Sequence, residues 1–156
     1  MALRNVVKDG DPVLLKTCKP VEKFDARLHE LLDDMKDTMY QADGVGSAAP
    51  QVGVIRRIVV IDTGEGFFEL VNPEILEVSE ETQYGVEGCL SFPGLYGYVT
   101  RPKTVKFRAQ NRNGEVYEME VSDLFARCVC HELNHLDGIV LPANIEAPYV
   151  EEEDEE

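Results

Sequence analysis

The chain carries the pentapeptide His131-Glu132-Leu133-Asn134-His135 within a segment whose apolar residues have helical spacing. Residues four apart on an α-helix lie on the same side, one turn apart, so the two histidines can bind one metal ion together. Glu132 lies beside that pair, where a carboxylate can exchange a proton with water on the metal. The pentapeptide therefore predicts a metal-dependent hydrolase, although two surface histidines beside a solvated glutamate would give the same pattern.

The residues around the pentapeptide predict the helix that organises the fold. Ser122 can cap its start, Asp123 is favourable in its first turn, and Gly138 is suited to its end. Its apolar face comprises Leu124, Phe125, Cys128, Val129 and Leu136. We expect this helix to be half-buried, with both histidines held on it rather than on a loop.

The rest of the chain predicts one earlier helix and several strands. Residues 24–40 carry apolar side chains at spacings of three and four, which are typical of an amphipathic helix. Strands are predicted at 55–61, 67–71, 104–110 and 116–121. Asn113-Gly114 is a hairpin turn signal between the last two. This order of elements predicts an α+β fold.

The composition predicts a globular cytoplasmic protein. Lys and Arg number 15 against 30 Asp and Glu, and the net charge of −15 argues against stable nucleic-acid binding. The N-terminus lacks the apolar core of a signal peptide, and no apolar run is long enough to span a membrane. Cytoplasmic thiols stay reduced, so the four cysteines are expected to be core residues or metal ligands.

The length of 156 residues predicts a single catalytic domain, which we place at residues 1–146. Residues 147–156 then form a tail that ends in six acidic residues, 151–156. Like charges repel and nothing there can pack, so we expect the tail to be disordered.

A catalytic site of this type needs a third protein ligand. A protease class with a third histidine is excluded, because Leu141 occupies that position. A tail glutamate lies at the distance used by another zinc peptidase class, but no predicted helix would fix it. Cys89 offers a thiolate from a separate, strand-like region, and the spacing favours it. A closed, non-catalytic site that adds Cys128 to Cys89 and the two histidines is a further alternative.

Three motifs, in this order, resemble those of peptide deformylase: Gly44-Val45-Gly46-Ser47-Ala48-Ala49-Pro50-Gln51, Glu87-Gly88-Cys89-Leu90-Ser91 and the pentapeptide. The resemblance covers residues 3–141. It implies a hydrolase that removes the formyl group from the N-terminal formyl-methionine of newly made polypeptides and releases formate. It also implies antiparallel sheets packed around a central helix that carries the pentapeptide.

The resemblance implies roles for individual residues. Cys89, His131 and His135 correspond to the ligands of one divalent metal ion, Fe²⁺ in the cell, with Zn²⁺, Ni²⁺ or Co²⁺ also able to bind. Glu132 corresponds to the general acid and base. The Gln51 amide and the Leu90 N–H correspond to the groups that polarise the formyl oxygen.

Substrate positions follow from the same resemblance. Gly46 corresponds to a position whose backbone helps to bind the substrate, and Val45, Leu124 and Cys128 correspond to the methionine pocket. Ordinary core packing would explain these last three equally well. The implied partners are formyl-methionyl peptides and nascent chains, with transient proximity to the ribosome.

Several positions depart from the family pattern. Ser47 replaces the usual Leu, and Asn134 replaces the usual Asp. Arg127 falls where an aliphatic residue is common, and we expect its charged end to reach solvent while its stem lines the pocket. Tyr96 lies near the place of a substrate-binding Arg in some relatives. The acidic C-terminus is not expected to dock on the ribosome as the longer, basic helix of some relatives does.

Overall fold

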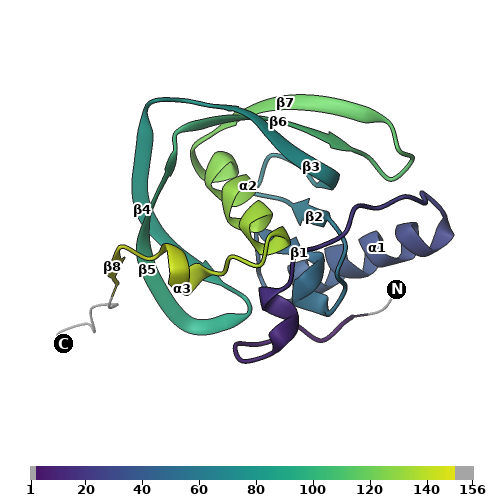
Figure 1. The fold of residues 1–156 in the computed structure, drawn as a ribbon, viewed down its shortest axis with the longest axis horizontal. Helices are drawn as coiled ribbons and strands as arrows, with labels where there is room; N and C mark the ends of the chain where they lie inside the picture. The colour runs from purple at the N-terminus through teal and green to yellow at the C-terminus, as the bar shows by residue number, and fades with distance from the viewer. Residues whose placement is uncertain (1–2, 150–156) are drawn as a thin grey trace.

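The late helix α2 (Asp123–Leu136) lies between two antiparallel sheets in a computed structural model that describes residues 3–149 (Figure 1). The first sheet has five strands in the order β1-β2-β3-β6-β7, and the second has three in the order β4-β5-β8. The early helix α1 (Ala26–Gln41) packs beside the first sheet (Figure 1). The predicted α+β fold with sheets around a central helix is therefore confirmed.

The remaining elements are short helices and strands. The helical ones are η1 (Pro12–Leu15), η2 (Ala49–Val52) and α3 (Leu141–Asn144). The strands of the five-stranded sheet are β1 (Gly46–Ala48), β2 (Ile58–Ile61), β3 (Phe68–Val78), β6 (Thr104–Gln110) and β7 (Val116–Ser122). Those of the other sheet are β4 (Thr82–Cys89), β5 (Phe92–Pro102) and β8 (Ala147–Pro148).

Strand β2 separates two apolar cores. Val59 and Ile61 belong to the core that holds α2, whereas Ile58 and Val60 belong to the core that holds α1. Successive side chains of a strand point to opposite faces, so a strand covered by a helix on each face needs apolar residues throughout. This explains why β2 is an unbroken apolar run.

The ends of α2 are fixed by contacts that its sequence only partly predicts. Ser122 holds the capping position, but its hydroxyl bonds to that of Thr104 at 2.9 Å instead of capping the helix. At the other end Gly138 has a left-handed φ of 76°, and its N–H donates to the carbonyl of His135. A Cβ at Gly138 would lie 2.5 Å from the Leu15 carbonyl oxygen, so only glycine fits there.

The β4–β5 hairpin is the main element that sequence patterns missed. Glycines at 85, 88, 94 and 97 interrupt its alternation of apolar and polar residues. The predicted tail also begins too early, because Ala147 and Pro148 pair with Tyr98 and Gly97 of β5. The acidic run 151–156 lies outside the described residues. Within residues 3–149, no helix is long and apolar enough to cross a membrane.

Candidate functional site

Three potential metal ligands converge at one point of the fold. Helix α2 presents His131 and His135 one turn apart, and Cys89 reaches them from the end of β4. Their ligand atoms all lie within 4.8 Å of one another, and Cys89 Sγ is 3.3 Å from His135 Nε2. Ligands placed 2.0–2.3 Å from a tetrahedral ion are separated by about 3.3–3.8 Å. The group therefore has the chemistry and spacing for one divalent ion with an open position.

Glu132 and Gln51 flank this group. Glu132 is buried, and its Oε1 has no hydrogen-bond partner among the described residues. Gln51, in η2, is held by its Oε1, which accepts from the Ala48 N–H at 2.9 Å. Its Nε2 consequently points towards Cys89 Sγ (3.5 Å) and Ser91 Oγ (3.2 Å). A buried carboxylate and an oriented amide donor thus lie on either side of the potential ligands.

A pocket of about 580 Å³ opens onto these groups. Glu132, Cys89 and His131 line it, whereas His135 lies behind it with 1% of its surface exposed. The predicted substrate positions Val45, Gly46, Leu124 and Cys128 also line it, and so do Gln51 and Leu90, which were predicted to polarise the formyl oxygen. The structure therefore brings all the sequence-predicted site residues to one place.

Close packing of β1 against α2 explains why a glycine is needed at position 46, which the sequence did not reveal. A Cβ on Gly46 would lie 2.5 Å from Cys128 Sγ and 2.8 Å from Glu132 Oε2. The absence of a side chain lets β1 lie directly against α2. Gly46 therefore closes one wall of the pocket around Glu132.

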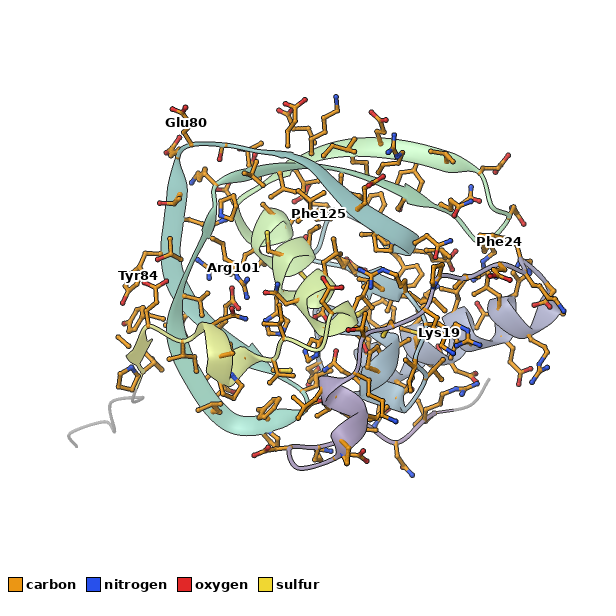
Figure 2. All side chains as sticks on the ribbon, in the orientation of Figure 1. Lys19, Phe24, Glu80, Tyr84, Arg101 and Phe125 are labelled. Atoms are coloured by element: carbon orange, nitrogen blue, oxygen red, sulfur yellow. The ribbon has the colours of Figure 1, made fainter. Side chains whose placement is uncertain are left out.

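A buried ionic network supports His131 from behind. Glu87 of β4 accepts from His131 Nδ1 at 3.0 Å and is bonded by both Arg101 and Arg127. Figure 2 shows Arg101 reaching into the space between β5 and α2. Glu87 has no proton to give when ionised, so His131 Nδ1 is the donor and Nε2 stays free to bind a metal.

Arg127 lines the pocket as expected, but the expectation that its charged end reaches solvent was wrong. Its side chain is only 9% exposed, and its guanidinium bonds to Glu87 (2.8 Å) and to the Val99 carbonyl (3.1 Å) instead of reaching solvent. A buried cation needs a partner of opposite charge, and Glu87 provides it.

The other departures have distinct environments. Asn134 Oδ1 accepts from Arg101 Nη1 at 2.7 Å, which joins it to the same network. Ser47 is buried in β1 opposite Val60. Tyr96 is 48% exposed at the pocket, with its ring where a Cβ of Gly88 would otherwise lie.

Burial and charge shift the pKa values of the site in different directions. Burial raises the pKa of Glu132 to about 7 and lowers that of His135 to about 3. Burial opposes the ionisation of Glu87, but hydrogen bonds from Arg101 and His131 outweigh it and lower the pKa to about 2. Burial likewise opposes charge on His131, but hydrogen bonds to Cys89 and Glu87 raise its pKa to about 10, so a metal that binds at Nε2 would displace a proton.

Sequence reasoning missed Glu87 and Arg101 as parts of the site. Glu87 belongs to one of the quoted motifs, two residues before Cys89, and this position could have indicated that it lies in the site. Arg101 has no local signal, because its contact with Glu87 depends on the pairing of β4 with β5.

The geometry bears on the two alternative metal sites. Within residues 3–149, the ligand group contains three side chains, and Cys128 is not one of them. Cys128 instead lies against β1, with its Sγ 3.7 Å from the Val45 carbonyl oxygen. The tail glutamates fall outside the described residues. The described ligand group is therefore an open, three-ligand site.

Comparison with known proteins agrees with this arrangement. The peptide deformylase of Alkaliphilus metalliredigens is 52% identical over 145 residues, which cover 93% of this chain and 98% of that protein. That of Caldicellulosiruptor bescii is 58% identical over 140 residues, covering 90% and 84%. A crystal structure of peptide deformylase from Thermotoga maritima superposes with a TM-score of 0.92 at 44% identity, covering 94% of this chain and 99% of that one.

The polypeptide deformylase family profile matches residues 3–149. Its members are metal-dependent hydrolases that remove the N-formyl group from the formyl-methionine of nascent polypeptides. The match spans the sheets, α2 and every residue of the pocket. The chain belongs to the peptide deformylase family.

Proposed function

We propose that Cys89, His131 and His135 bind one divalent metal ion and that the pocket beside them hydrolyses the formyl group of formyl-methionyl peptides. The convergence of the three ligand atoms within 4.8 Å carries this proposal. A thiolate with two imidazoles suits Fe²⁺, Zn²⁺, Ni²⁺ or Co²⁺. We infer Fe²⁺ as the metal in the cell. Such an ion would supply a Lewis acid that makes hydroxide available at neutral pH.

Glu132 has the properties of the general base and acid. Its pKa of about 7 lets it hold or release a proton near neutral pH. General acid–base catalysis is most efficient when the pKa of the catalytic group lies close to the working pH. Its Oε1 is buried without a partner, so it is free to accept a proton from water in the pocket. We infer that Glu132 then passes this proton to the amine that leaves with the peptide.

Gln51 and Leu90 are suited to stabilise the formyl oxygen as negative charge develops there. The Gln51 amide is oriented by Ala48 and directs its N–H groups towards Cys89. Leu90 follows Cys89 in the turn between β4 and β5 and lines the same pocket. Donors held in place before the reaction stabilise an oxyanion without reorganisation, and one such donor contributes about 3–4 kcal/mol.

We infer that the substrate backbone binds between the exposed edges of two strands that line the pocket. Both β1 and β4 are edge strands, and residues of each line the pocket. An extended peptide can bond to such edges as an added strand. We infer that the methionine side chain then enters among Val45, Leu124 and Cys128.

We infer that the chain through β8 acts as one catalytic domain, because β1, η2, β4 and α2 all contribute to the pocket and β8 pairs with β5. Its substrates, nascent chains, arise at the ribosome, which places the reaction in the cytoplasm. The net charge of −15 favours transient proximity to the ribosome over stable contact with its RNA. Ribosome binding that is salt-sensitive and lost on deletion of residues 142–156 would contradict this.

The decisive experiment measures formate release from formyl-Met-Ala-Ser and metal content together, in protein prepared anaerobically with iron. The wild type should bind one metal per chain and turn over. Cys89→Ala should lose both metal and activity, whereas Glu132→Gln should keep the metal and lose turnover. Cys18→Ala is the matched control, because Cys18 is a buried cysteine of the core away from the pocket.

Two results would count against the assignment. If Cys89→Ala kept its metal and activity, the third ligand would be another residue. If Glu132→Gln turned over at the wild-type rate, the site would not use this carboxylate.

A further inference from the structure

Four hydrogen bonds converge on the carboxylate of Glu87. Arg101 binds both oxygens, with Nε 2.8 Å from Oε2 and Nη2 2.9 Å from Oε1. The other two bonds come from α2: Arg127 Nη1 donates to Oε2 at 2.8 Å, and His131 Nδ1 contacts Oε1 at 3.0 Å. Glu87 is therefore held from β5 and from α2 at once.

Arg127 and His131 reach Glu87 from the same face of one helix. They are four residues apart, so their side chains lie one above the other along α2. Each bonds a different oxygen of the same carboxylate. Arg127 thus ties Glu87 to α2 independently of His131 and sets where Oε1 stands relative to the imidazole.

The surroundings keep Arg127 in this position. Its guanidinium also donates to the Val99 carbonyl at 3.1 Å, so β5 holds it from the far side. A Cβ on Gly85 would lie 3.0 Å from Arg127 Nη2. The glycine therefore leaves the space that the guanidinium occupies between β4 and α2.

We propose that Arg127 is a positioning residue for the metal centre, which acts through Glu87 to fix the ring orientation of His131. The proposal rests on the proposed function only in taking His131 as a ligand. A carboxylate on the far nitrogen of a ligating histidine fixes its tautomer and direction, and loss of such a partner typically weakens metal binding about 10–100-fold. Arg127 would contribute by limiting the freedom of that carboxylate.

The test measures metal binding without substrate, because Arg127 also lines the pocket. Zn²⁺ affinity of the metal-free protein is measured by competition with a chromophoric chelator for wild type, Arg127→Leu and Arg127→Lys. The d–d absorption of the Co²⁺-loaded forms reports the ligand geometry. We expect Arg127→Leu to bind Zn²⁺ more weakly by up to about 10-fold, the lower end of the range for losing a direct partner of a ligand, because Arg101 still holds Glu87, and to shift the Co²⁺ spectrum. Arg127→Lys should recover part of both, because an ammonium can still bond Oε2.

Arg112→Leu is the matched control. Arg112 also bonds two acidic residues, Glu69 and Asp33, but these lie outside the pocket. Its loss should lower the unfolding midpoint and leave Zn²⁺ affinity and the Co²⁺ spectrum unchanged. If Arg127→Leu does not fold, Gly85→Ala replaces it, because the added methyl would lie 3.0 Å from Arg127 Nη2 and push the guanidinium by a few tenths of an ångström while its charge remains.

The outcomes separate this inference from the proposed function. A wild type that binds no stoichiometric metal would overturn the proposed function. If the wild type binds metal and turns over while Arg127→Leu matches it in Zn²⁺ affinity and Co²⁺ spectrum, only the positioning role fails. Equal changes in Arg127→Leu and Arg112→Leu would also overturn it, because any loss of stability would then produce the effect.

Discussion

The two sides of α2 are held by opposite kinds of contact. Towards the five-stranded sheet, Phe125 and Val129 are buried among apolar side chains of the strands. Towards β4 and β5, Arg127 and His131 bond to the buried carboxylate of Glu87. Figure 2 shows Phe125 and Arg101 in these two environments, on different sides of the helix.

The difference shows how stability and geometry are divided between the two sides. Apolar burial stabilises the fold by about 25 cal/mol per Å² and depends little on direction. A buried ionic network gains little net free energy, because desolvation offsets the attraction, but its bonds are directional. We therefore expect the apolar side to determine stability and the polar side to determine the geometry of the site.

Of the substitutions considered, Glu132→Gln on the polar side should have the largest effect, which is on turnover. Loss of the proton-transferring carboxylate should lower turnover of formyl-Met-Ala-Ser about 10²–10⁴-fold. Metal content should remain at the wild-type value, because Glu132 is outside the ligand group. Parallel formate and metal assays check this, and a loss of metal together with activity would show that Glu132 supports the ligands directly.

Phe125→Ala should have the complementary effect on the apolar side. Phe125 packs against Phe68 and Phe107, with ring centroids 5.3 and 6.4 Å away. The resulting cavity should lower the free energy of unfolding by about 3–5 kcal/mol. Urea unfolding measures this, and Zn²⁺ affinity of the folded variant should match the wild type. A large change in affinity would show that the two sides are coupled.

The pH dependence of the free energy of unfolding should show how much the buried, ionised Glu132 carboxylate destabilises the fold. Its pKa is raised from 4.5 to about 7 by burial, so its contribution is favourable below pH 4.5 and lost as pH rises through 7. At pH 8 metal-free Glu132→Gln should be more stable than metal-free wild type by up to about 3 kcal/mol. At pH 5 the difference should fall below about 1 kcal/mol.

Urea unfolding at the two pH values checks this prediction. Glu80→Gln is the control for the substitution itself, since Glu80 is exposed and remote from the pocket. A stability difference for Glu132→Gln that is equal at pH 5 and pH 8 would contradict the assigned cause.

Asn134→Asp should give the smallest effect. Arg101 and Asn144 both donate to Asn134 Oδ1, so a carboxylate can replace the amide without reversing either bond. The charged acceptor should raise the free energy of unfolding by about 1 kcal/mol. Thermal unfolding measures it, with Asn113→Asp in the exposed β6–β7 turn as control. Destabilisation would show that the network does not accommodate a second acid.

Local patterns predicted the elements whose contacts repeat along the chain. The spacing of three and four predicted both long helices. For α1, the observed helix begins and ends within two residues of the predicted bounds, 24–40. Residues 104–110 matched β6 because one face is buried and the other is not. Strands β4 and β5 were not predicted, because glycines interrupt their apolar pattern. These glycines are needed where a Cβ would collide with a neighbouring side chain, as Gly97 would with Ile145. Such contacts leave no periodic signal.

The site divides in the same way. His131 and Glu132 were found from one turn of helix, and Cys89 and Gln51 from motifs that resemble a family. The environment of Arg127 was predicted wrongly, because arginine ordinarily keeps its charge in water. Its burial depends on Glu87, which is 40 residues away in sequence and reaches it only through the packing of β4 on α2.

By itself, the sequence determined the two helices, the pair of histidines with their neighbouring carboxylate, and the acidic character of the protein. These depend on spacing within a few residues and on composition. The tertiary structure brings Cys89, which the sequence had favoured, to the two histidines, and it alone decided that Gly46 leaves room beside Glu132 and that two arginines share Glu87. The physical reason is that ligand distances and buried charge pairs join segments far apart in the chain, and strand pairing and helix packing alone set where those segments meet.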